Sequence, residues 1–193
     1  MPIPNKHLEE VVFLSELELN CSLFNRAFSA LQISARHRIN LDNGIDDEQP
    51  GSPILIVEQC TVCLSALAAI RRILSPVSTK PRTQERASRL RDLLDSPSLP
   101  HVTTVAVRNS WEHLDERLDA VLVERATTSG PVEQLSVSSR TPNPNSFVLR
   151  RFDPTTFAIQ FAGDAIPLLP CVDEIKELKA RIDKAYEKLN IDE

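Results

Sequence analysis

The chain has 193 residues, the length of one ordinary domain. Hydrophobic residues make up 41% of it and charged residues 25%, which is typical of a soluble protein with a real core. The formal net charge of −5 excludes the overall positive field on which non-specific nucleic-acid binding depends, so only a local basic patch could serve that purpose.

The first ten residues, MPIPNKHLEE, lack the charged-then-apolar pattern of a secretory signal. The longest apolar run, 54–70, is interrupted by Glu58 and Gln59, and it is shorter than the roughly 20 residues that span a bilayer. We therefore expect a cytoplasmic protein that does not enter a membrane.

Two of the four cysteines, Cys60 and Cys63, form a CxxC inside this apolar run. No second CxxC and no neighbouring histidine completes the ligand set of a zinc site. We expect reduced cysteines in the core, and we expect neither a metal nor another cofactor.

The first half of the chain is predicted to be helical. Apolar residues recur at spacings of three and four over 7–38, which indicates a long amphipathic helix, with a break near 20–22. Residues 40–53 contain Asn-Gly, Pro-Gly and Ser-Pro, so they should form a loop. The most apolar segment, 54–74, is expected to be a central helix buried on most sides, and a further helix is predicted over 83–94.

In the second half of the chain, the spacing of apolar residues changes from that of a helix to that of a strand and back to that of a helix. A helix is predicted over 104–125, followed by a long loop that contains a short strand around 134–137. Apolar and polar residues then alternate on both sides of the Asp153-Pro154 turn, which indicates a β-hairpin. The last predicted helix covers 172–189, with an apolar stripe along one face.

These elements predict a mainly α protein, a bundle of about five helices with a small C-terminal β-hairpin. We expect 1–193 to form a single α-rich domain, in which 127–165 is an elaboration made of the long loop and the hairpin.

The segment 105–122, VAVRNSWEHLDERLDAVL, contains the only Trp and is the candidate site. Helical spacing creates two polar faces, one with Asn109, His113 and Glu116 and the next with Arg108, Glu112 and Asp115. One interpretation is a solvated face on which Arg108 pairs with Glu112 and the acidic residues form a structural network. A metal held by His113 and Glu116 is disfavoured, because a bare HxxE lacks further ligands.

The residues Arg108, Asn109 and His113 resemble the signature of the HEPN superfamily (higher eukaryote and prokaryote nucleotide-binding domains), in which four to six residues separate an Arg from a His and Asn often follows the Arg. The longer phrase RNSWEHLDERLD is similar to an RNxxEHxDERLD signature in a group of uncharacterised bacterial proteins. That group shares the helix ending in LSP, the RLRDLL helix and the RRFDP…FAGD hairpin, so the similarity runs from about residue 54 to the end.

The HEPN resemblance implies an α-helical homodimer in which the Arg and His of both chains meet at a cleft. Active members are metal-independent endoribonucleases of toxin or phage-defence systems, which implies an RNA substrate and an antitoxin-like partner. His113 would then take the proton of a ribose 2′-hydroxyl, Arg108 would clamp the phosphate, and Asn109 would orient either one. Many HEPN-like domains are instead non-catalytic dimerisation or interaction modules, and this alternative stays open.

An RNA-binding surface needs positive charge, and the segment 71–91 carries seven positive residues against one negative, Glu85. If this segment flanks the candidate site, its helical arginines Arg86, Arg89 and Arg91 are the predicted phosphate-binding residues. The alternative is that the patch pairs with the acidic loop 42–48. Against catalysis, Glu112, Asp115 and Glu116 crowd the phosphate position with negative charge.

Overall fold

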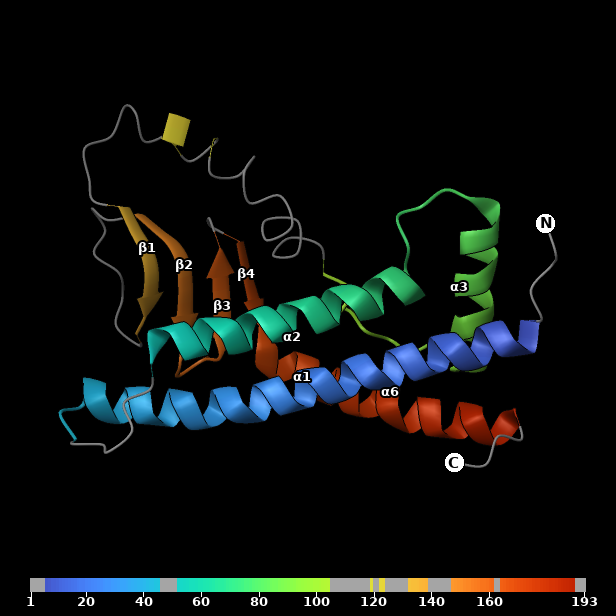
Figure 1. Ribbon diagram of the computed structural model, residues 1–193, viewed down its shortest axis with the longest axis horizontal. Coiled ribbons are helices and arrows are strands. Elements are labelled where there is room, and N and C mark those ends of the chain that lie inside the picture. Colours follow the sequence, from blue (N-terminus) through green and yellow to red (C-terminus); the bar gives the residue numbers. More distant parts are fainter. Residues whose placement is uncertain are drawn as a thin grey trace. The chain divides into compact units, whose positions relative to one another are not determined.

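The computed structural model describes residues 6–45, 52–104, 119, 122–123, 132–138, 147–161 and 164–189. Over these residues the protein is mainly helical, as predicted, with a small mixed sheet that lies in the chain between the third and the last helix (Figure 1). The helices are α1 (Lys6–Asp42), α2 (Pro53–Leu74), α3 (Pro81–Leu93) and α6 (Leu168–Lys188). The strands are β1 (Val132–Val137), β2 (Phe147–Asp153), β3 (Ala158–Phe161) and β4 (Asp164–Pro167).

The chain divides into two compact units. Unit 1 consists of Met1–Arg26, Val62–Thr103 and Pro170–Glu193, and unit 2 consists of Ala27–Thr61 and Thr104–Leu169. Helices α1 and α2 each contribute one part of their length to each unit.

Helix α1 is continuous over 37 residues, so the predicted break near 20–22 is wrong. The side-chain amide of Asn20 donates to the carbonyl oxygen of Glu16 at 2.7 Å, one turn back, and so remains within the helix. The helix also extends to Asp42, into the predicted loop. Gly44 follows two residues after the end of the helix, and its φ of 73° is the left-handed conformation that commonly terminates helices.

Helix α2 confirms the predicted central helix, and its buried residues include Ile56, Ile70 and Leu74. Its first turn is more exposed than expected, since Ile54 is 67% exposed. With 22 residues, α2 is long and apolar enough to cross a membrane, so the length argument against membrane entry is wrong. In its most apolar window 44% is buried inside the protein, and the expectation of no membrane stays a prediction.

Prolines explain why two helices begin earlier than predicted. Pro81 is the first residue of α3, where its missing N–H costs no hydrogen bond and its fixed φ suits the helix. Pro170 lies in the first turn of α6, where proline is also tolerated, so that helix starts at Leu168.

The sheet of unit 2 has the strand order β1-β2-β3-β4, with β1 parallel to β2 and the other two pairs antiparallel. The predicted hairpin is confirmed by β2 and β3, and the predicted short strand by β1. The carboxylate of Asp153 shapes the hairpin turn by accepting the backbone N–H groups of Thr155 and Thr156 at 2.9 and 3.3 Å. The parallel pairing and β4 were not predicted.

An aromatic cluster forms part of the core of unit 2. The ring of Phe157 lies 5.5 Å from that of Phe28 in α1 and 5.9 Å from that of Phe152 in β2, centroid to centroid. Phe152 and Phe161 are 2% and 1% exposed, so the sheet is well covered at these two positions.

Candidate functional site

The residues of the HEPN-like signature lie outside the described residues, and their roles stay predictions. They are Arg108, Asn109, Glu112, His113, Asp115 and Glu116. The structure does describe the three arginines of α3 that were predicted to bind phosphate, and it gives each of them a different environment.

Arg89 is held by carboxylates in unit 1, where α3 crosses the N-terminal part of α1 (Figure 1). Its guanidinium lies 2.6 Å from Glu9, 3.2 Å from Glu10 and 3.2 Å from Glu85. Partial desolvation by itself would lower the pKa of Arg89, but the hydrogen bonds to Glu9 and Glu10 outweigh it and raise the pKa. Its charge is therefore compensated within the protein.

The other two arginines contact uncharged groups. The guanidinium of Arg86 lies over the ring of Phe13, 4.1 Å from the centroid, in a cation–π contact. Arg91 donates from Nη1 to the carbonyl oxygen of Leu74 at 2.6 Å. In the described part of the chain, no carboxylate lies within ion-pair distance of Arg91.

The acidic partners of α3 are thus Glu9 and Glu10, together with Glu85 of α3 itself. Asp42, the first residue of the acidic loop that we considered as an alternative partner, instead pairs with Arg38 one turn earlier in α1, at 2.9 Å. The rest of that acidic loop, 46–48, lies outside the described residues.

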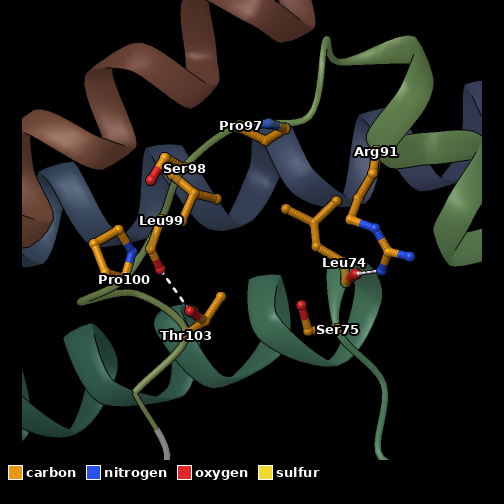
Figure 2. A pocket seen from close by; sticks show the side chains of 8 residues that line it. All are labelled: Leu74, Ser75, Arg91, Pro97, Ser98, Leu99, Pro100 and Thr103. Atoms are coloured by element: carbon orange, nitrogen blue, oxygen red, sulfur yellow. Dashed lines mark hydrogen bonds between the residues drawn. The ribbon is translucent and has the colours of Figure 1, made fainter.

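Arg91 lines a pocket of about 250 Å³ in unit 1 (Figure 2). Its walls come from the end of α2, from α3 and from the loop after α3: Leu74, Ser75, Arg91, Pro97, Ser98, Leu99, Pro100 and Thr103. Asp95 and Ser96 have φ values of 53° and 48°, in the left-handed region, and they turn the chain at the end of α3 into this loop.

A histidine–carboxylate pair anchors the same loop. Glu174 of α6 is 9% exposed and accepts the backbone N–H groups of His101 at 3.0 Å and of Val102 at 2.9 Å. Nδ1 of His101 lies 2.5 Å from Oε1 of Glu174, so Nδ1 carries the hydrogen and Nε2 is the acceptor in the neutral ring. Nε2 has no hydrogen-bond partner in the part that the structure describes, and the side chain is 43% exposed.

This pair was not predicted from the sequence, because 73 residues separate its members. One local signal was present. Glu174 is spaced three residues after Cys171 and four before Leu178, so it lies on the apolar face of its helix. A carboxylate on such a face needs a hydrogen-bonding partner, and here the partner is the loop of the pocket.

The four cysteines are buried, and none takes part in a disulfide. Among the described residues, no group of three or more histidines, cysteines and acids could hold a metal ion. Burial raises the pKa of the thiols of Cys21, Cys63 and Cys171 to about 12, and in Cys171 the charge of Glu174 adds to the effect. The thiolate, which is the reactive form, is therefore scarce in the folded protein.

We expect Ellman's reagent at pH 8 to label the native protein slowly and all four thiols at once in denaturant. A thiol pKa raised from 9.0 to about 12 by folding stabilises the protein below pH 9, and this contribution is lost as the pH rises from 9 towards 12. Urea unfolding between pH 8 and pH 11 should therefore show falling stability. Fast labelling of the native protein at pH 8 would contradict this account.

Comparison with family models, curated proteins and solved structures finds no match for this chain.

Proposed function

We propose that this protein is a HEPN-like helical homodimer that acts as an interaction module and does not cut RNA. The observation that carries the proposal is the environment of Arg89, the centre of the predicted phosphate-binding set. Three carboxylates surround its guanidinium within 3.2 Å.

Releasing Arg89 to an RNA phosphate would be costly. The side chains of Glu9 and Glu10 are only 16% and 19% exposed, so they would be left largely desolvated without their cation. Arg82, two turns earlier in α3, also faces Glu9 at 3.5 Å. The positive charges of Arg82 and Arg89 thus act within the protein, so α3 offers no continuous track for a phosphate backbone.

The second candidate is a metal-independent endoribonuclease, which the spacing of Arg108, Asn109 and His113 favours. In that mechanism His113 removes the proton of the ribose 2′-hydroxyl, and Arg108 stabilises the charge that develops on the phosphate. The attack leaves a 2′,3′-cyclic phosphate on one product. DNA, which lacks the 2′-hydroxyl, would be spared.

The two candidates differ in what labelled RNA shows in excess EDTA. The interaction module predicts intact RNA after incubation with the wild-type protein, and a sedimenting species with the mass of two chains. His113→Ala should behave in the same way, and so should His7→Ala, a control in the exposed first turn of α1.

Cleavage that yields cyclic-phosphate ends, spares DNA and disappears only in a folded His113→Ala variant would overturn the module and support the ribonuclease. A monomer at all concentrations would also contradict the proposal. If Arg108 and Glu112 belong to the dimer interface, alanine at either position should weaken the dimer.

A further inference from the structure

The three arginines of α3 that were predicted to bind phosphate are not equivalent, and Arg91 is the one that lines a pocket. Arg89 is paired with acids and Arg86 lies on an aromatic ring. Arg91 donates one of its five N–H groups to the carbonyl oxygen of Leu74. The other N–H groups of its side chain have no acceptor in the described part of the protein. Its charge is therefore available to a ligand.

The surroundings of Arg91 add a hydroxyl group suited to an oxyanion. Figure 2 shows the Arg91 side chain reaching from α3 to the end of α2, and the Ser75 hydroxyl directed from there toward the loop. Ser98 also lines the pocket, and Figure 2 shows its hydroxyl directed away from Arg91. Arg71 and Arg72 belong to the last turn of α2, a position at which positive residues favour the negative end of the helix dipole.

The size of the pocket limits its ligand. At about 250 Å³ it is smaller than most sites for drug-sized molecules, so it suits a single charged group with a few more atoms. The loop that closes it contains Pro97 and Pro100, and Glu174 pins its backbone at His101. Because this loop is already ordered before a ligand binds, ligand binding costs little conformational entropy of the loop.

From these observations we propose that the pocket between the end of α2, α3 and the 97–103 loop binds the phosphoryl group of a small molecule, with Arg91 as its principal ligand-binding residue. The planar guanidinium suits phosphate because two parallel N–H groups can contact two oxygens. Such a group could come from inorganic phosphate or from a small phosphomonoester. The proposal does not depend on whether the protein cuts RNA.

Isothermal titration calorimetry at constant ionic strength tests this site, with inorganic phosphate and ribose 5-phosphate as separate probes. Arg91→Gln should weaken binding of either probe by about tenfold or more, because a charge-assisted pair is lost. Arg91→Lys keeps the charge without the two-pronged geometry, and it should fall between Arg91→Gln and the wild type. Arg82→Gln, on the same helix with a 67% exposed side chain, is the matched control and should bind like the wild type.

Tighter binding of ribose 5-phosphate supports a phosphomonoester ligand, and equal binding supports free phosphate. Circular dichroism checks that each variant folds. If Arg91→Gln does not fold, the comparison of Arg91→Lys with the wild type tests the proposal. Two results would overturn the proposal: no heat of binding with either probe, or Arg91 variants that bind as well as Arg82→Gln.

Discussion

Replacing Glu174 by alanine is expected to lower the free energy of unfolding by about 3 kcal/mol, because it leaves several donors without an acceptor. The carboxylate accepts the backbone N–H groups of His101 and Val102 and the Nδ1–H of His101. Val102 is 2% exposed, so water cannot replace the lost acceptor there. Urea denaturation followed by circular dichroism measures the change.

Two further variants separate the contribution of the hydrogen bonds that Glu174 accepts from the general effect of removing an acidic residue on the free energy of unfolding. Glu174→Gln keeps the shape and one carbonyl acceptor, so its loss should be smaller than that of alanine. Glu177→Ala removes a 50% exposed acid that pairs with Arg181 one turn along the same helix, and it should cost less than about 1 kcal/mol. Equal losses for Glu174→Ala and Glu177→Ala would show that Glu174 does not hold the loop.

The second large effect is expected in the sheet. Phe152→Ala should lower the free energy of unfolding by about 4 kcal/mol, the usual cost of emptying a buried phenylalanine site. Phe152 is 2% exposed in the strand that pairs with both β1 and β3, opposite Val137 and Ile159. It also makes an edge-on contact with Phe157. Thermal and urea unfolding measure the loss.

Leu169→Ala is the matched control, because Leu169 belongs to the same unit but is 46% exposed. Its loss should be under about 1 kcal/mol, as for most surface substitutions. Amide hydrogen exchange should locate the effect of Phe152→Ala in β1, β2 and β3. A Phe152→Ala variant as stable as Leu169→Ala would mean that the aromatic cluster contributes little.

Several elements could be predicted because their signals are local. The apolar run from Ile54 indicated α2, and the Asp153-Pro154 turn between alternating residues indicated the hairpin. The predicted helix boundaries were wrong where the same residue type can either end a helix or be accommodated inside it. The polar residues at 20–22 predict a helix break, but the side chain of Asn20 bonds within the helix. Pro170 predicts a helix that starts after it, but it lies in the first turn of α6.

The candidate site was harder to predict than the elements around it. The sequence shows seven positive residues in 71–91. This pattern is compatible with a row of unpaired arginines, but it is equally compatible with arginines that pair with acids elsewhere in the chain. The partners of Arg89 come from Glu9 and Glu10, about 80 residues earlier, so the spacing within α3 carries no information about them.

By itself, the sequence determined that the protein is mainly helical, where its buried helix lies and where its hairpin turns, because helix and strand periods and turn residues act over a few positions. Only the tertiary structure decided which arginine is neutralised by acids, which one faces a pocket, and that Glu174 holds the loop at His101. It also decided that β1 runs parallel to β2. These contacts join segments far apart in the chain, and they depend on how whole elements pack rather than on any local pattern.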